Sequence, residues 1–376
     1  MKCKCPEIRP SRMARLFDLF LRQLLICCVY VALQNGSSVD AADQVVTRNE
    51  TLFGKIESVS TESVQLLPRG STSASREIGV SDVVMIQFSD EPQDLIEAKR
   101  RLVKNNFVGA LEAIQQVDKD AIQGASVAVR GEYAYVRAVD AGHVAMGATE
   151  KMSPALSSIK KVIDQFIRSI HYYDLLEVAG NLEQALGRYD EAASLYKKIA
   201  NGPPPMVVRA GRLQGDILAA EGRYPEAIKE FEKVQSVDLV GGFVEQEKMM
   251  ACLGQAESLV SLGRFSEAAS VIRSMLSGSP PEDVPVSVTN VLLGNAYSLL
   301  GRALAEMKQD QDALIAYLTV DLVYGDAPET HAEALFHLFQ LWNRGGYPRR
   351  AAEVRERLIK TYPQSTWAAE LNSSAK

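Results

Sequence analysis

Hydrophobic and polar residues follow two different periods along this chain, and the change falls near residue 91. Between residues 42 and 91 they alternate, as in "TLFGKIESVS", "ESVQLL" and "REIGVSDVVMIQF". This period of two predicts four or five short β-strands, with "STE" as a turn and "PRGSTSAS" as a loop. So few short strands bury a core only by curling into a small barrel or by packing on a neighbour.

The strand segment is similar to the small Sm-like or SH3-like barrels of bacterial envelope proteins, in which "G-K-I-x-S" leads a sharply bent strand. Here the likeness is carried by Gly54 to Ser58. Gly54 is expected to permit the bend, because glycine in a strand often marks a tight bend. We therefore predict a small antiparallel, barrel-like β module over residues 42–91.

From about Pro92 onward, apolar residues recur at spacings of three and four, which predicts helices. Two stretches repeat each other: "GNLEQALGRYDEAASLYKKI" begins at Gly180, and "GDILAAEGRYPEAIKEFEKV" begins at Gly215. Each has a small residue, then a glycine, an alanine and an aromatic residue at the same intervals. Self-similarity at about 34 residues is typical of stacked helix–turn–helix units.

The repeated pattern resembles the tetratricopeptide repeat. Two units carry it in full: Gly180, Gly187, Ala192 and Tyr196, then Gly215, Gly222, Ala227 and Phe231. Three more units depart from it at single positions: Ala256, Gly263, Ala268, Ile272 and Pro280; Gly301, Lys308, Ala313 and Tyr317; Gly346, Ala351, Arg355 and Pro363. A degenerate opening unit is marked by Ala98, Asn105 and Ala110, and residues 126–170 are long enough for a pair without the pattern.

The spacing within a unit has a physical interpretation. A small residue in each helix lets the two axes approach, so Gly180 is expected to face Ala192. Gly187 is expected to take the left-handed conformation that ends the first helix, and the aromatic residue to bury against the next unit. Because no unit buries its core alone, the resemblance implies a mainly α fold, a right-handed solenoid with a concave face.

The N-terminus predicts a targeting segment. Residues 1–41 combine six Lys/Arg, the apolar stretch "LLICCVYVAL" and small residues at Val39 and Ala41, which together indicate a secretory signal peptide. The alternatives are an uncleaved anchor and a lipoprotein signal, although Ile26 is not the small residue that lipidation needs before Cys27. A signal peptide predicts export to the periplasm or cell envelope.

After this segment we expect four further parts. They are the β module at 42–91, degenerate helical repeats at 92–174, a tetratricopeptide-like solenoid at 175–366 and a C-terminal tail at 367–376.

Charge and cysteine content narrow the classes of function. The formal net charge is −6, and residues 1–41 hold six of the 41 Lys/Arg but only three of the 47 Asp/Glu, so the remainder is more acidic. Nucleic-acid binding is disfavoured, because it depends on clustered Lys/Arg. Cys252 is the one cysteine beyond residue 41, and we predict a buried structural thiol.

The sequence contains no recognisable catalytic, cofactor or metal motif. The phosphate loop "G-x-x-x-x-G-K-[ST]" and the nucleophile elbow "G-x-S-x-G" do not occur. The histidines are His143, His171, His331 and His337, and the last two are six residues apart, on different faces of a helix. "DAGH" pairs Asp140 with His143 but offers no nearby nucleophile. We expect no enzyme activity, cofactor or metal.

Binding is the remaining class. Tetratricopeptide arrays generally bind peptides or protein surfaces on the concave face lined by their first helices. By position, the resemblance implies a groove formed by Glu177, Asn181, Arg212, Asp216, Glu257 and Arg302. This groove has mixed charge and lacks the Lys/Asn cluster that holds a C-terminal carboxylate in some members of the family. A peptide bound by its C-terminal carboxylate is therefore disfavoured as the ligand.

The predicted function is a protein-interaction scaffold or adaptor that binds other proteins or peptides. One alternative is a β module that binds a polymer, such as glycan or nucleic acid, with the solenoid as an accessory. The other is an unrecognised hydrolase that uses Glu177 and Asp216.

Overall fold

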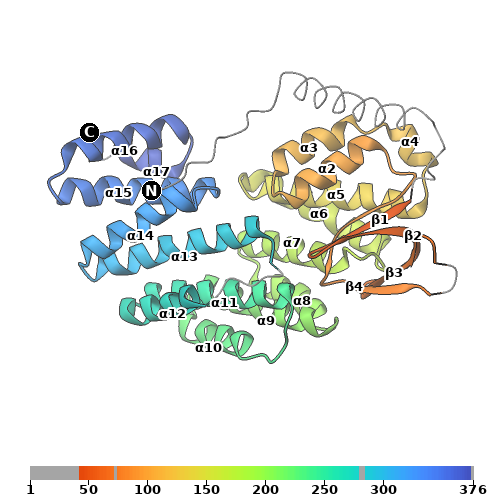
Figure 1. The fold of residues 1–376 in the computed structure, drawn as a ribbon, viewed down its shortest axis with the longest axis horizontal. Helices are drawn as coiled ribbons and strands as arrows, with labels where there is room; N and C mark the ends of the chain where they lie inside the picture. Colours follow the sequence, from red (N-terminus) through yellow and green to blue (C-terminus); the bar gives the residue numbers. More distant parts are fainter. Residues whose placement is uncertain (1–41, 72–73, 279–283, 374–376) are drawn as a thin grey trace, which may run out of the picture. The chain divides into compact units, whose positions relative to one another are not determined.

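The computed structural model describes residues 42–71, 74–278 and 284–373, in which an antiparallel sheet is followed by sixteen helices (Figure 1). This arrangement confirms the predicted fold class, which is mainly helical with a small β module ahead of the helices. The predicted signal peptide at residues 1–41 lies outside the described residues.

The β module is an open five-stranded sheet. Its strands are β1 (Asp43–Thr47), β2 (Thr51–Val59), β3 (Ser63–Pro68), β4 (Arg76–Gly79) and β5 (Val83–Gln87). They pair antiparallel in the order β4-β3-β2-β1-β5, so that, among the described residues, β4 and β5 form the two edges. Gly54 is needed where β2 meets β3, because a Cβ there would lie 2.1 Å from the carbonyl oxygen of Leu67.

The helices follow as consecutive pairs. The predicted opening unit is α2 (Gln93–Val103) and α3 (Phe107–Gln116). A short helix, α4 (Lys119–Gly124), precedes the pair expected within residues 126–170, α5 (Val127–Ala145) and α6 (Thr149–Gln165). The later pairs are α7 (Tyr172–Ala185) and α8 (Tyr189–Ile199), α9 (Pro204–Ala220) and α10 (Tyr224–Gln235), α11 (Gly242–Ser261) and α12 (Phe265–Ser277), α13 (Val286–Glu306) and α14 (Asp310–Val323), and α15 (Pro328–Arg344) and α16 (Pro348–Thr361).

The sheet completes its core with the first helices. Val45 and Ile86 of the sheet lie in one hydrophobic cluster with Leu95 of α2 and Val136 of α5. Of the two ways in which a few short strands can bury a core, packing on a neighbour is the one observed.

The turn within six of the described helix pairs contains a left-handed residue. Four turn glycines have φ between 73° and 77°: Gly187, Gly222, Gly263 and Gly346. In the unit without a glycine, Lys308 takes the same conformation with a φ of 62°, and Asn105 does so in the opening unit with a φ of 56°. The geometry of the turn is therefore kept where the preferred residue is missing, at a cost in backbone strain.

The small residue of the first helix makes room for an aromatic ring. A Cβ on Gly180 would lie 2.1 Å from Cε1 of Tyr196, so the ring occupies the place predicted for Ala192. Gly301 is related to Tyr317 in the same way. The prediction that Gly180 faces Ala192 was therefore wrong, because the closest neighbour of this glycine lies one helical turn further along α8.

The aromatic residue of the second unit also reaches its neighbour. Cβ atoms on Gly215 of α9 and Gly254 of α11 would each lie 2.5 Å from the ring of Phe231, so this ring is wedged between two units. The alanines predicted to pack the second helices are buried as well; they are Ala192, Ala227, Ala268 and Ala313.

Two features of the C-terminal half differ from a regular array. The long step from Gly222 to Gly263 reflects the 20 residues of α11 and the linker before it. The expected tail begins instead as α17 (Thr366–Ser373), in which Ala368 and Leu371 are buried. Pro280, predicted to end the third unit, lies outside the described residues.

Candidate functional site

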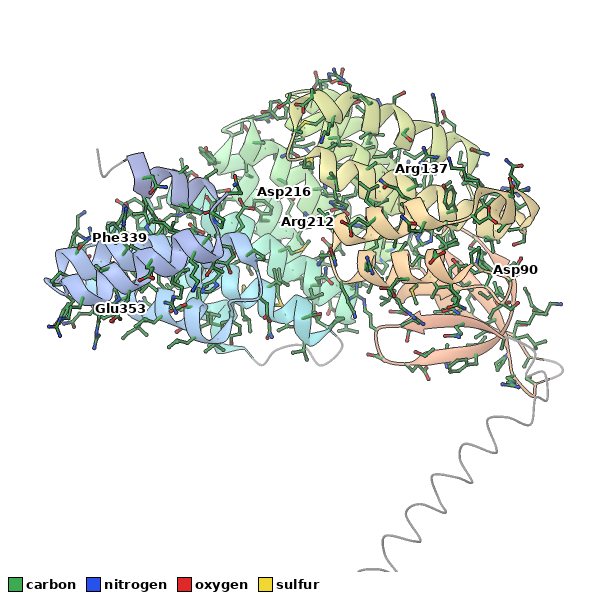
Figure 2. All side chains as sticks on the ribbon, turned by 90° about the horizontal axis from the view of Figure 1, so that it is seen from above. Asp90, Arg137, Arg212, Asp216, Phe339 and Glu353 are labelled. Carbon is green, nitrogen blue, oxygen red and sulfur yellow. The ribbon has the colours of Figure 1, made fainter. Side chains whose placement is uncertain are left out.

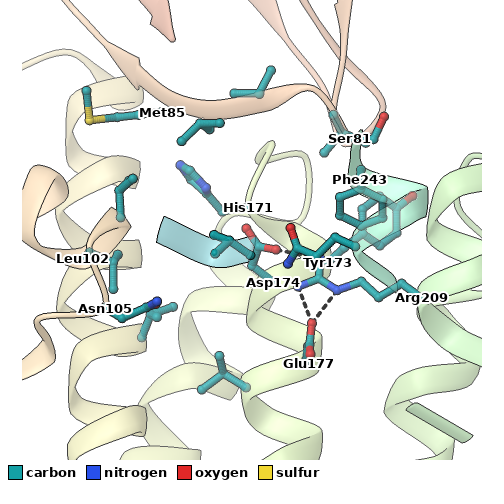
Figure 3. Close-up of a pocket in the computed structure, with 18 of the residues that line it drawn as sticks. Ser81, Met85, Leu102, Asn105, His171, Tyr173, Asp174, Glu177, Arg209 and Phe243 are labelled. Carbon is teal, nitrogen blue, oxygen red and sulfur yellow. Dashed lines mark hydrogen bonds and ion pairs between the residues drawn. The ribbon is translucent and has the colours of Figure 1, made fainter. Parts of the chain in front are cut away.

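A cavity of about 480 Å³ lies between the β module and the first helices of several pairs (Figure 3). One wall is β5 with the turn before it, and the other walls come mainly from α2, α5, α7, α9 and α11. Residues distant in sequence, such as Ser81 and Phe243, border the same space. The cavity is therefore a product of the tertiary arrangement, since no single repeat forms it.

The cavity has an apolar part and a polar part. Met85 and Leu102 lie on one side in Figure 3, whereas Asp174 and Arg209 lie toward the other. His143, which also borders the cavity, stacks on Phe107 with ring centroids 4.0 Å apart. Burial lowers the pKa of His143, and the nearby carboxylate of Glu177 only partly offsets this effect. The histidine is therefore a neutral, largely apolar part of the wall at neutral pH.

Arg209 of α9 connects two first helices at the polar part. Its Nη1 donates to Asp174 Oδ1 of α7 at 2.8 Å, and it forms a second ion pair with Glu177 (Figure 3). Its guanidinium also lies 5.8 Å from the centre of the Phe243 ring of α11. One side chain thus contacts three consecutive units.

Arg212, one turn further along α9, makes the larger set of contacts. It donates to Glu177 Oε1 at 2.9 Å, to Asp216 Oδ2 at 2.6 Å and to Glu247 Oε2 of α11 at 2.5 Å. Figure 2 shows Arg212 and Asp216 close together near the middle of the helical array. Because all three nitrogens of the buried guanidinium bind carboxylates, Arg212 ties α7, α9 and α11 together.

These contacts set the charge of each group. Burial alone would raise the pKa of Glu177, but Arg209 and Arg212 outweigh burial and lower it. At Asp216 burial dominates, and the pKa is raised to about 6, because Arg212 is opposed by Glu177 and Glu247. The two arginines are in contact with four carboxylates in all, so the network carries more acidic than basic groups.

The six predicted groove residues fall at two places. Four lie at or beside the large cavity: Glu177, Asn181, Arg212 and Asp216. Asn181 Oδ1 accepts a hydrogen bond from the hydroxyl of Tyr196 at 2.6 Å. Glu257 and Arg302 form an ion pair at a second cavity of about 320 Å³ between α11, α13 and α15. In that cavity Ser298 Oγ donates to Glu333 Oε2 at 3.0 Å.

Sequence reasoning missed Asp174 and Arg209. A signal for both was present, because Asp174 lies three residues before Glu177 and Arg209 three before Arg212. Residues three apart share a face of a helix, so each belongs to the same face as a predicted groove residue.

Nothing in the sequence indicated that the β module contacts α11, far along the chain. Arg48 Nη1 donates to Gln246 Oε1 of α11 at 3.1 Å, and its guanidinium lies 5.4 Å from the centre of the Phe243 ring. Arg48 Nε also donates to the carbonyl oxygen of Ser81 at 3.2 Å. This side chain therefore joins the β1–β2 turn, the β4–β5 turn and α11 at one rim of the cavity.

A buried ionic cluster lies at the base of the same wall. Lys99 Nζ is 2.8 Å from Glu91 Oε1 and 2.7 Å from Glu132 Oε2, and His171 Nε2 is 2.8 Å from Glu132 Oε1. Burial would raise the pKa of Glu132, yet His171 and Lys99 lower it to about 2. The ring of His171 stacks on Tyr135, 3.6 Å between centroids. This cluster holds the end of the sheet, α2, α5 and the start of α7 together.

The other singled-out residues lie apart from the cavity. His331 is hydrogen-bonded to Asp321 and to Tyr362, both at 2.8 Å. Cys252 is only partly buried, contrary to the prediction, and burial still raises the pKa of its thiol to about 11. Asp140 is fully buried, and neither of its carboxyl oxygens has a hydrogen-bond partner among the described residues. Those residues also contain no group of three or more His, Cys, Asp or Glu placed to hold a metal ion.

The fold and the cavity together define the class, an α-solenoid of tetratricopeptide-like helix pairs joined to an N-terminal sheet. Comparison with protein-family models agrees with the repeats: residues 178–237 match the tetratricopeptide repeat. This segment runs from within α7 to just beyond α10, and so contains both units that carry the complete pattern.

Several solved structures resemble the chain at low sequence identity. A tetratricopeptide repeat protein from Parabacteroides merdae ATCC 43184 is 17% identical with a TM-score of 0.47, covering 76% of this chain and 100% of that one. The apo form of RapI is 12% identical with a TM-score of 0.48, covering 74% and 79%. PilW, described as a widely conserved type IV pilus biogenesis factor, is 16% identical with a TM-score of 0.44, covering 63% and 97%.

No curated protein matches the sequence. Among the helices of residues 42–71, 74–278 and 284–373, none has the length and apolar character needed to cross a bilayer.

Proposed function

We propose that this protein is a non-catalytic scaffold that binds a segment of a partner protein in the cavity beside β5. The observation that carries the proposal is the cavity itself, which is about 480 Å³ in volume and has an apolar part next to a polar one. Binding sites are commonly concave and mainly apolar, with a few well-placed polar groups. The match of residues 178–237 to the tetratricopeptide repeat supports a protein partner.

The predicted groove residues have different parts in this proposal. Arg212 is buried with all its nitrogens engaged, so it positions α7, α9 and α11 and does not itself contact the partner. Asn181 borders the cavity and uses Oδ1 for the Tyr196 hydroxyl, so its amide group is available to donate to a partner carbonyl. Glu257 and Arg302 would contact a partner only where it reaches the second cavity.

Export to the periplasm or cell envelope is part of the same proposal. Its support is the basic and apolar composition of residues 1–41 and the small residues at Val39 and Ala41. N-terminal sequencing of the protein isolated from its native cell tests this point. A mature chain that begins near Ala42 agrees with a cleaved signal peptide, and a membrane-bound chain that retains Met1 indicates an anchor.

A pair of matched variants tests the binding cavity. Val103 borders the cavity and is 46% exposed, so Val103→Glu places a charge at the site without burying it. Val108 on α3 is 63% exposed and is not one of the residues that line the cavity, so Val108→Glu is the control. Both variants are expected to keep the helical circular dichroism and melting temperature of the parent chain.

Each variant and the parent chain are expressed with a tag in the native cell, cross-linked and purified, and partners are quantified by mass spectrometry. We expect a partner that is retained by the parent and by Val108→Glu but lost from Val103→Glu. Retention of every partner by Val103→Glu would show that the cavity is not the binding site. Recovery of glycan or nucleic acid alone would favour the polymer-binding alternative.

A further inference from the structure

The outer edge of β5 has no backbone partner in the described chain. β5 is the last strand in the sheet order, and it pairs only with β1, from Gln44 opposite Gln87 to Thr47 opposite Val83. Beyond this ladder, no backbone hydrogen bond of the described residues reaches the residues of β5. Such an edge presents a row of amide and carbonyl groups that can pair with another chain.

The register of the ladder leaves one residue of β5 unmatched. Met85 pairs with Val46 and Val83 with Thr47, so Val84 is the extra residue of a β-bulge. A bulge interrupts the ladder and is common at sheet edges and beside functional sites, where it changes the direction of side chains.

The cavity runs along this same edge. Ile86 is buried in the core that the sheet shares with the helices, and Met85, the residue before it, faces the opposite way because side chains alternate along a strand. Val83, paired with Thr47, packs against the same hydrophobic cluster as Ile86, and it borders the cavity together with Met85 from the opposite face. With β1 on one edge of β5, a space that touches both residues lies along the other edge, and Figure 3 shows the strand crossing over the residues of the helices.

We propose that the partner binds as an added β-strand, an extended peptide that pairs with the free edge of β5. This inference rests on the proposed function. An extended segment matches the unpaired amide and carbonyl groups of β5, whereas a helix satisfies its own backbone and leaves them without partners. Side chains on one face of the peptide contact the apolar part at Leu102 and Val103, and those on the other face point away from the helices.

The first step of the test selects a probe. A phage library of random dodecapeptides is panned against the full-length chain, and the enriched peptide is synthesised with a fluorescent label. Its dissociation constant is measured for the parent, Val103→Glu and Val108→Glu. The expected result is binding that Val103→Glu weakens at least about tenfold, a loss of about 1.4 kcal/mol, while Val108→Glu leaves it unchanged. Failure to obtain such a peptide would overturn both the proposed function at this cavity and the inference.

The second step asks how the peptide backbone is bound. Each residue of the selected peptide is N-methylated in turn, which removes one amide donor. Because successive amides of a strand point to opposite sides, alternate positions are expected to lose about tenfold or more in affinity and those between them to change little. An even profile, with binding still sensitive to Val103→Glu, overturns strand addition and leaves the proposed function intact.

Hydrogen exchange gives an independent reading on the protein itself. Binding of the selected peptide is expected to slow amide exchange in β5, while β4, the other edge strand, serves as the internal control. Unchanged exchange in β5 at saturating peptide would also overturn strand addition.

Discussion

Replacing Asp140 by asparagine is expected to stabilise the protein at neutral and alkaline pH but not at acid pH. Asp140 lies in α5, is fully buried, and has no hydrogen-bond partner for either carboxyl oxygen among the described residues. Burial raises the pKa of this carboxyl from 3.8 to about 7. An ionised carboxylate in such a place is costly, so the native state holds the proton more tightly than the unfolded state does.

The magnitude follows from the two pKa values. A difference of about 3 units corresponds to about 4 kcal/mol, because each unit is worth about 1.4 kcal/mol. The sign follows from proton linkage: between pH 4 and pH 7 the native state binds more protons at Asp140, so the free energy of unfolding falls as the pH rises. The side-chain amide of the Asp140→Asn variant does not titrate in either state, so the variant lacks this slope.

The assay is urea unfolding followed by helical circular dichroism at pH 4.5, 6 and 8. The difference in unfolding free energy between Asp140→Asn and the parent is expected to be within about 1 kcal/mol at pH 4.5. It should grow by about 3 to 4 kcal/mol in favour of the variant by pH 8. Asp164→Asn, at an exposed position of α6, is the control and should show no such growth.

Comparing variant with parent at each pH removes the effect of other titrating groups. Glu132, for example, has a pKa lowered to about 2, so its contribution is lost only as the pH falls below its ordinary value of 4.5. A stability difference for Asp140→Asn that stays constant from pH 4.5 to 8 would refute the reasoning, because Asp140 would then titrate alike in both states.

Three further predictions concern the repeats. Gly180→Ala should lower the free energy of unfolding in urea by about 1–3 kcal/mol, because the new Cβ overlaps the Tyr196 ring. The control, Gly124→Ala, has open space around its Cβ and should not destabilise the protein, so equal effects would contradict the packing described. Lys308→Gly should stabilise by about 0.5–1 kcal/mol, because Lys308 has a φ of 62°, and an unchanged midpoint would show that the left-handed lysine carries no strain. Tyr196→Phe should lower the free energy of unfolding by about 1 kcal/mol, because it removes the hydrogen bond to Asn181. Tyr317→Phe removes a buried hydroxyl that has no partner among the described residues, so it should be neutral or stabilising. A larger loss for Tyr317→Phe than for Tyr196→Phe would contradict these hydrogen-bond assignments.

The elements could be predicted because their signals are local. The alternation of residues 42–91 and the spacing of three and four beyond Pro92 depend only on which side of a strand or helix is buried. The repeat glycines act locally as well, since each ends the helix that precedes it. Even the drifted units could be placed, because Lys308 and Asn105 occupy the turn position and take the turn conformation without being glycine.

The packing partner of Gly180 was predicted wrongly for a geometric reason. The sequence shows that a small residue in one helix is followed by a small and an aromatic residue in the next, but not which of the two lies opposite it. The relative shift of two packed helices decides this, and it is set by the volumes of all the side chains between them. In α7 and α8 that shift brings Tyr196 over Gly180.

What the sequence determined by itself is the class of fold. It predicted one groove of six residues, of which Glu177, Asn181, Arg212 and Asp216 lie at or beside one cavity and Glu257 and Arg302 at another. Only the tertiary structure decided that all three guanidinium nitrogens of Arg212 bind carboxylates, that β5 forms a wall of the cavity, and that Arg48 contacts α11. Helices and turns follow from residues a few positions apart, whereas these contacts join residues up to 198 positions apart and depend on how the sheet and the repeats share one core.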